Sequence, residues 1–300
     1  MKIALIMPKN RVDYLAKTIL DGLYSLEKEG LLALTKNYTE ADLIFLFWGK
    51  GDMDFKLAED IGRWGKTVFI DGSELGKDRR YDKEIQKAVI EGTWVDNGKI
   101  DKDMLEKCAL YFRRERPYPS GVIPLPYGIN SEYVRYQRGI KKDIDFVCIF
   151  GQEEFPILRK EVREYLEDYC AKNGFTCYTQ RTKNQNEFYN LLARAKVGIS
   201  VGGGGFDTAR FWEILANNCL LLTEKIAIYE EKSGELNYER IKEFSNLPEF
   251  EEKLKEVAQF LRKGYNENDL FQEYGEILKR HSSRARVQTI LDAAKEKNLI

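Results

Sequence analysis

Four consecutive glycines stand between an apolar run and an amphipathic one, and three polar residues follow them. The glycines are Gly202, Gly203, Gly204 and Gly205, and the polar residues are Asp207, Arg210 and Glu213. Glycine has no side chain, so such a run suits either a ligand that must approach the backbone closely or a turn that needs positive φ. The segment is neither a G-x-G-x-x-G nor a Walker loop. It predicts a cradle for phosphate, with a plain tight turn as the alternative.

The residues that flank the glycines predict one strand–helix–strand unit. Apolar residues alternate along Val197–Val201, as they do in a buried strand. Asp207 is a candidate N-cap for a helix that closes at Asn217–Asn218, and Cys219–Leu222 predicts the next strand. In such sheets, ligands lie beyond the carboxyl ends of the strands, where amides at a helix N-terminus suit an anion. The glycine loop is therefore expected to face a ligand.

The same alternation of strand and helix runs through both halves of the chain, which predicts parallel sheets covered by helices. Strands are expected at Ile3–Met7, Leu43–Trp48, Thr67–Ile70 and Cys108–Phe112, and then at Ile144–Phe150, Phe175–Tyr178 and near Arg240–Phe244. Residues 113–133 hold four of the seven prolines and are typical of a connection between lobes. The expected architecture is α/β, with two Rossmann-like lobes at residues 1–135 and 136–283, a cleft between them, and a C-terminal helix at 284–300.

The overall composition narrows the classes of protein. Lysine and arginine number 48 against 49 acidic residues, a net charge of −1, so no global field favours nucleic acid. The five cysteines show no C-x-x-C spacing, and buried thiols of a cytoplasmic protein explain them best. One histidine, His281, excludes a histidine-based metal cluster and is interpreted as structural. The N-terminus is typical of a first strand, not a signal peptide, and no stretch is long enough to span a bilayer.

Several segments resemble one family. "ARFWEILANNCLLLTE" (209–224) resembles the nucleotide-binding motif of GT-B glycosyltransferases, in the group-1 branch that includes spore-maturation-protein-like enzymes. "IPLPYGIN" (123–130) is similar to the turn that ends their N-terminal lobe, and "DIDFVCIFGQ" (143–152) resembles the strand and glycine turn that open their donor lobe. "KRHSSRARVQTIL" (279–291) resembles their C-terminal helix. The resemblance covers about residues 120–290, and it implies two lobes with the nucleotide-sugar on the second.

The resemblance also implies roles for the polar residues. Glu213 matches the glutamate that accepts hydrogen bonds from the ribose hydroxyls, because a carboxylate offers two acceptor oxygens to a vicinal diol. Arg210, one turn earlier, would neutralise the diphosphate. The loops at Gly151 and Gly202–Gly205 would bring amides to the sugar or phosphate. Many relatives carry a second glutamate near the glycine loop, which contacts the sugar; glycine stands there in this sequence, and Asp207 is a candidate substitute.

Each of these residues also has a purely structural interpretation. Glu213 could be a solvated helix residue, and Arg210 could form a surface ion pair with Glu213 or Asp207. The cluster Arg113, Arg114 and Arg116 could bind a phosphate or an acidic acceptor, or could be a solvated rim. Asp71 ends a strand, where an inverting transferase could keep its base, or it could cap a helix at Gly72–Leu75.

Together these observations predict a glycosyltransferase that moves a sugar from a nucleotide-sugar to a carbohydrate or other acceptor. No metal site and no resident cofactor are expected, because the glycine loop, the helix N-terminus and Arg210 would stabilise the leaving diphosphate. The group-1 resemblance favours retention of anomeric configuration, which needs no strong base in the first lobe. Two alternatives stay open: a nucleotide-sugar epimerase of the same plan, and a non-catalytic protein that binds nucleotide-sugars or carbohydrates.

Overall fold

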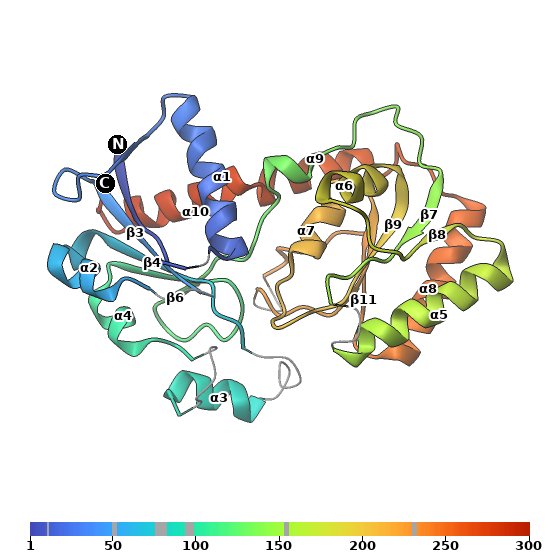
Figure 1. Cartoon of the computed structure of the whole chain (residues 1–300), viewed down its shortest axis with the longest axis horizontal. Helices are drawn as coiled ribbons and strands as arrows, with labels where there is room; N and C mark the ends of the chain where they lie inside the picture. The colour runs from blue at the N-terminus through green and yellow to red at the C-terminus, as the bar shows by residue number, and fades with distance from the viewer. Residues whose placement is uncertain (11, 50–52, 76–82, 94–98, 153–155, 230–232) are drawn as a thin grey trace.

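The chain forms two α/β lobes, each built on one parallel sheet (Figure 1). The computed structural model describes residues 1–10, 12–49, 53–75, 83–93, 99–152, 156–229 and 233–300. The predicted fold class, α/β with two lobes and a C-terminal helix, is confirmed. No helix within these residues is long and apolar enough to cross a membrane.

The N-terminal lobe contains a six-stranded sheet in the order β2-β1-β3-β4-β5-β6. Its strands are β1 (Lys2–Ile6), β2 (Ala33–Thr35), β3 (Leu43–Trp48), β4 (Thr67–Asp71), β5 (Leu110–Arg113) and β6 (Val122–Pro124). Its helices are α1 (Tyr14–Lys28), α2 (Phe55–Ile61), α3 (Lys83–Glu91) and α4 (Lys102–Lys107). Every strand pair is parallel, so the carboxyl ends of all six strands lie on one edge.

The C-terminal lobe contains a five-stranded parallel sheet in the order β11-β10-β9-β7-β8. Its strands are β7 (Ile144–Val147), β8 (Cys177–Tyr178), β9 (Ala195–Ser200), β10 (Leu220–Glu224) and β11 (Ile241–Phe244). Its helices are α5 (Ile157–Asn173), α6 (Gln185–Arg194), α7 (Ala209–Leu215), α8 (Leu247–Lys263) and α9 (Phe271–His281). The strand order reverses between β7 and β9, and such a point is where open α/β sheets bind ligands.

Local sequence explains most of these elements. The run LIFLFW in β3 is buried on both faces of the sheet, as a central parallel strand requires. Polar side chains cap the helices: Asp13 accepts a hydrogen bond from Ala16 N at 2.7 Å, and Asn184 accepts one from Glu187 N at 2.9 Å. The sequence did not reveal β2, β6, α2, α3 or α4. Both missed strands have three residues, too few to show a period.

The proline-rich segment 113–133 was expected to be a connection, and this was wrong in part. Its residues Val122–Pro124 form β6, the edge strand of the N-terminal sheet. Pro124 is tolerated because an edge strand leaves one side without ladder hydrogen bonds. The crossing to the second lobe comes later, between β6 and β7.

The chain crosses between the lobes twice, and the two crossings bind each other. Ile129 N donates to the carbonyl of His281 at 2.8 Å, and Ser283 N donates to the carbonyl of Ile129 at 2.9 Å. The His281 ring is buried, with Nδ1 3.1 Å from Arg286 Nη2 and Nε2 2.9 Å from the Tyr238 hydroxyl. Because arginine can only donate, Nδ1 accepts and Nε2 carries the hydrogen. Burial, with Arg286 nearby, lowers the pKa of His281 to about 2, so the ring is neutral where the two crossings meet.

The last helix, α10 (Ser283–Glu296), returns to the first lobe and packs against α1 (Figure 1). The contact is close at Gly22 of α1, where an added Cβ would lie 2.3 Å from the Ser283 carbonyl oxygen and 2.8 Å from Val287 Cγ2. Only glycine lets the two helices approach this closely. The C-terminal helix therefore fastens the end of the second lobe onto the first.

This contact predicts that Gly22→Ala destabilises the protein, although alanine is ordinarily the better helix former. Overpacking against a backbone carbonyl should lower the free energy of unfolding by about 1–3 kcal/mol. Gly275 of α9 is a matched control, because an added Cβ there meets nothing within 4 Å. Gly275→Ala should raise stability by up to about 1 kcal/mol. Urea denaturation of both variants checks this, and stabilisation by both would contradict the close contact.

Candidate functional site

A pocket of about 610 Å³ lies between the lobes, at the point where the strand order of the C-terminal sheet reverses. The segments that follow β7, β8 and β9 form its floor, and among the described residues of the first lobe Tyr14, Glu74 and Tyr127 form the N-terminal wall. The C-terminal lobe contributes, among others, Gly151, Arg159, Arg181, Phe188, Arg210 and Glu213. Residues about 200 positions apart in the sequence thus face one cavity.

Close contacts, and not backbone conformation, explain Gly203, Gly204 and Gly205. None of Gly202–Gly205 has a positive φ, so the tight-turn alternative does not explain them. A Cβ on Gly204 would lie 2.0 Å from Glu74 Oε2, and one on Gly205 would lie 2.3 Å from Arg114 Nη2. The Gly202 amide is already bound, donating to Glu224 Oε2 at 2.7 Å. The loop therefore lets side chains of the first lobe reach the backbone of the second.

The sequence predicts Asp207 as the N-cap of α7, and this prediction is wrong. Thr208 is the cap, and its hydroxyl accepts from Arg210 N at 3.3 Å. Asp207 is 3% exposed, and its two oxygens accept from Tyr127 N at 2.5 Å and from Trp212 Nε1 at 2.9 Å. Burial raises the pKa of Asp207 to about 7, against the opposing effect of Arg114. Its carboxylate ties the two lobes together.

Arg210 and Glu213 lie on the wall of the pocket, so neither is a solvated surface residue. Arg210 Nη1 is 3.2 Å from Glu213 Oε2, and the Tyr189 hydroxyl donates to Glu213 Oε1 at 3.3 Å. Glu213 is 6% exposed, and burial raises its pKa despite Arg210. The Arg210 guanidinium lies 3.8 Å from the centre of the Phe188 ring, and its Nε has no hydrogen-bond partner among the described residues.

Two further arginines, which the sequence analysis missed, line the same pocket. Arg159, in the first turn of α5, is 9% exposed and donates from Nε and Nη2 to the Val201 carbonyl at 3.3 and 3.0 Å. Arg181 donates to the Gly151 carbonyl. The sequence does contain a signal for Arg159. It lies in the first turn of the helix that follows the first strand of the lobe, where the carboxyl ends of the strands meet. Helix α7 has only seven residues, so the positive charge of the site comes mainly from these arginines.

Asp71 lies outside the pocket, in the interior of the first lobe. Its carboxylate is fully buried and pairs with Arg113 Nη1 at 2.5 Å, while the Tyr111 hydroxyl donates to it at 2.8 Å. Ser73 N donates to its other oxygen at 2.8 Å, and no helix forms at residues 72–75. The helix-capping interpretation is therefore wrong, and the predicted base is not among the residues that face the cleft.

The arginine cluster is an interior joint and not a solvated rim. Arg113 and Arg114 are both fully buried. Arg114 donates to the Tyr127 hydroxyl and, at 3.4 Å, to the Asp207 carbonyl. Arg116 donates to the Tyr229 carbonyl at 2.9 and 3.0 Å. Arg114 and Arg116 join the lobes, and Arg113 pairs with Asp71 within the first lobe. This leaves the acceptor-binding role proposed for them without support from the geometry.

The described aspartates with a spacing that could suggest a metal site form ion pairs or cap a helix. The spacing Asp-x-Asp occurs at Asp143 and Asp145, which pair with Arg194 at 2.8 Å and with Lys196 at 2.6 Å. It occurs again at Asp101, the cap of α4, and Asp103, while a third pair begins at residue 52, outside the described residues. Among the described residues, no group of three or more histidine, cysteine, aspartate or glutamate side chains is placed to hold a metal ion.

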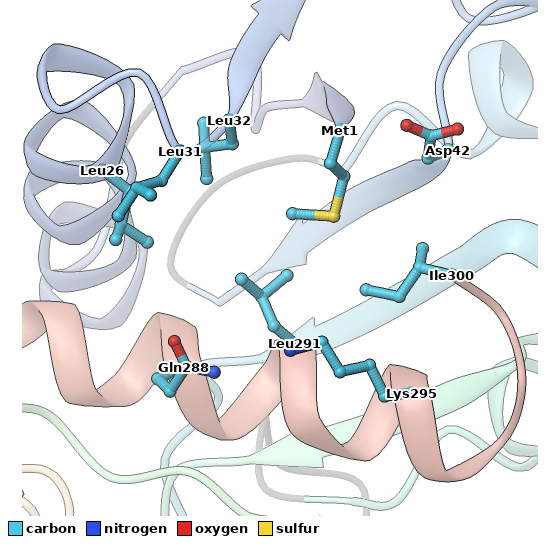
Figure 2. A pocket seen from close by; sticks show the side chains of 9 residues that line it. All are labelled: Met1, Leu26, Leu31, Leu32, Asp42, Gln288, Leu291, Lys295 and Ile300. Carbon is cyan, nitrogen blue, oxygen red and sulfur yellow. The ribbon is translucent and has the colours of Figure 1, made fainter.

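A second pocket of about 520 Å³ lies on the first lobe, away from the reversal of strand order (Figure 2). Leucines of α1 and its following turn, Leu291 of α10, Met1 and Ile300 line it, and its charged residues are Asp42 and Lys295. This pocket is mostly apolar and holds one lysine, whereas three arginines line the interlobe pocket. The interlobe pocket is therefore the candidate functional site.

Comparisons with known proteins agree with this architecture. No protein-family model matches the sequence, and no curated protein does. A glycosyltransferase from Rickettsia africae is similar in structure over 99% of this chain and 98% of its own, with a TM-score of 0.51 and 10% identity. An alpha-glucosyltransferase in complex with UDP and DNA matches over 98% and 99%, with a TM-score of 0.55 and 8% identity. A putative UDP-N-acetylglucosamine 2-epimerase from Listeria monocytogenes matches over 98% and 95%, with a TM-score of 0.53 and 11% identity.

At these identities the likeness shows the fold, and that fold is GT-B: two Rossmann-like lobes with a C-terminal helix. The narrower spore-maturation-like branch stays a prediction. The site residues also stay predictions, because fold similarity alone assigns no role to a side chain.

The packing of the glycine loop predicts a contrast between neighbouring substitutions. Gly205→Ala would press on the buried side chains of Arg114 and Glu115 and should lower the free energy of unfolding by about 1–3 kcal/mol. Gly204→Ala meets only the end of the Glu74 side chain, which is 21% exposed and can move. Its effect should stay below about 1 kcal/mol. Equal losses in urea denaturation would contradict this account of the loop.

The raised pKa of Asp207 predicts a dependence of stability on pH. Between about pH 4 and pH 7 the folded protein holds a proton that the unfolded chain has released, so this contribution to stability falls as the pH rises through that window. The Tm of the wild-type protein should therefore fall relative to that of Asp207→Asn between pH 4 and pH 7. Above pH 7 the difference between the two Tm values should stay constant. Parallel Tm profiles of the two proteins would show that Asp207 does not titrate in this range.

Proposed function

We propose that the protein is a glycosyltransferase that binds a nucleotide-sugar in the interlobe pocket and transfers the sugar to an acceptor. The observation that carries this proposal is the convergence of Arg159, Arg181 and Arg210 on one pocket at the reversal of strand order. A dianionic diphosphate matches three guanidinium groups, which bind phosphate through paired N–H donors. The glucosyltransferase of the same fold was solved with UDP, which supports a uridine nucleotide as the first candidate.

The arginines would also promote the reaction. Negative charge develops on the leaving diphosphate as the glycosidic bond breaks, and fixed cations in a partly enclosed site stabilise it. Removal of one such contact typically costs about 10²–10³ in rate. We further propose that turnover needs no metal ion, because Arg159, Arg181 and Arg210 supply the charge.

Glu213 is proposed to bind the ribose of the nucleotide. It lies on the pocket wall beside Arg210, so one turn of α7 would hold the ribose and the adjacent phosphate together. Retention of anomeric configuration is proposed from the family resemblance. It accords with the position of Asp71, the carboxylate considered as an N-lobe base, which lies buried outside the pocket.

An epimerase is the second candidate, because the Listeria neighbour of the same fold is described as a putative UDP-N-acetylglucosamine 2-epimerase. An epimerase would use the same diphosphate site and return a rearranged nucleotide-sugar. A transferase would release nucleoside diphosphate and glycosylate an acceptor. Analysis of the nucleotide product by chromatography therefore separates the two, and binding without any product would indicate a protein that only binds.

The proposal predicts that Arg210→Ala weakens UDP binding by about 10- to 100-fold, the effect of one charged hydrogen bond, and leaves uridine binding nearly unchanged. Arg194→Ala is the matched control, since that arginine pairs with Asp143 on the surface. Titration calorimetry measures the affinity of both variants, after a thermal-shift panel of UDP, GDP, ADP and dTDP with their sugars has identified the nucleotide.

The proposed metal independence predicts that product formation is equal in magnesium and in excess EDTA. A wild-type protein that binds none of these nucleotides would overturn the proposal, and activity lost in EDTA and restored by metal would overturn metal independence.

A further inference from the structure

The N-terminal wall of the pocket is chemically unlike its floor. Among the residues that the structure describes, the three arginines all belong to the C-terminal lobe, whereas the first lobe presents Glu74 and two tyrosines, Tyr14 and Tyr127. The centres of the two tyrosine rings are 5.9 Å apart. This wall thus offers a carboxylate and aromatic faces where the floor offers cations.

Glu74 reaches across the pocket. It follows β4 by three residues, and its Oε1 is 3.4 Å from Nη1 of the buried Arg114. Its Oε2 is so close to the glycine loop that a Cβ on Gly204 would lie 2.0 Å away. The side chain is 21% exposed, so the carboxylate lies at the boundary of the cavity.

The described residues give the pocket two other carboxylates, and these have different surroundings. Both oxygens of Asp207 accept hydrogen bonds that tie the lobes, and Glu213 pairs with Arg210. Within the described part of the chain, Glu74 is thus the pocket carboxylate contributed by the first lobe. The sequence suggested Asp207 for the contact with the sugar, but the geometry favours Glu74 for that contact.

Charge decides which part of a nucleotide-sugar can lie against Glu74. A diphosphate would be repelled by this carboxylate and attracted by the arginines on the floor. With the ribose at Glu213 and the diphosphate at the arginines, the sugar extends toward the N-terminal wall. Its hydroxyl groups can donate to a carboxylate, and its C–H faces can pack on tyrosine rings.

We propose that Glu74 binds the hydroxyl groups of the transferred sugar and selects a neutral sugar over one that carries a carboxylate. The inference rests on the proposed nucleotide-sugar function. A uronic acid would place a second negative charge beside Glu74 in a partly desolvated site, where like charges repel strongly. Arg114 positions Glu74 through the contact between its Nη1 and Glu74 Oε1, and Arg114 does not itself line the pocket.

The test compares sugar-dependent binding in Glu74→Ala and Glu74→Gln with the wild-type protein. Calorimetry gives the Kd of UDP, of UDP-glucuronate and of the neutral donor that the wild type binds best among UDP-glucose, UDP-galactose and UDP-N-acetylglucosamine. The Kd for UDP should stay within about twofold in both variants. The ratio of the neutral-donor Kd to the UDP Kd should rise about tenfold in Glu74→Ala, the loss of one charged hydrogen bond. The same ratio for UDP-glucuronate should fall in both variants.

Glu59→Gln is the control, because Glu59 is exposed on α2 and lies outside the pocket. Unchanged ratios in both Glu74 variants would overturn the inference while leaving the proposed function intact. Binding of UDP and of the neutral donor that tightens by the same factor in Glu74→Ala would also overturn it, since Glu74 would then act on the nucleotide and not on the sugar. A wild-type protein that binds no nucleotide fails at the earlier step, and the proposed function falls with this inference.

Discussion

The buried guanidinium of Arg114 is the constraint on which the arrangement of the lobes depends. A fully buried cation must be paired, because desolvation costs several kcal/mol and removal of one partner typically costs about 3–5 kcal/mol. Arg114 meets this requirement with the Tyr127 hydroxyl, the Asp207 carbonyl and the Glu74 carboxylate, which come from both lobes. Beside it, Glu115 Oε2 accepts from Asp207 N at 3.0 Å. Separation of the lobes would expose or unpair these groups together.

This joint also shapes the pocket. The loop that carries the glycines must pass over Arg114 and Glu115, so Gly205 has no room for a side chain. The same contacts hold Tyr127 and Glu74 against the cavity, which turns residues of the first lobe into a wall for a ligand held on the second. Interlobe packing and ligand recognition therefore use the same few residues, and a substitution at the joint should be judged by its effect on both.

The charge of the site is local. A net charge of −1 gives the chain no general attraction for anions, yet Arg159, Arg181 and Arg210 lie around one cavity. Field lines concentrate in such a cleft because its walls have a low dielectric constant. Each arginine is also fixed by the protein: Arg159 by the Val201 carbonyl after β9, Arg181 by the Gly151 carbonyl and Arg210 by the Phe188 ring. Cations held in this way need little reorganisation when charge develops on a leaving group.

The sequence by itself determined the fold class and the position of the glycine loop, because apolar periodicity and glycine runs are local signals. It also indicated Arg210 and Glu213, which lie one turn apart on a single helix. Tertiary structure decided what no local signal carries: that Arg113 and Arg114 are interior, that Thr208 caps α7 in place of Asp207, and that Arg159 and Glu74 face one pocket. Whether a charged side chain is a solvated rim or a buried joint depends on residues about a hundred positions away. Burial and pairing are properties of the packed chain and cannot be read from the spacing of residues along it.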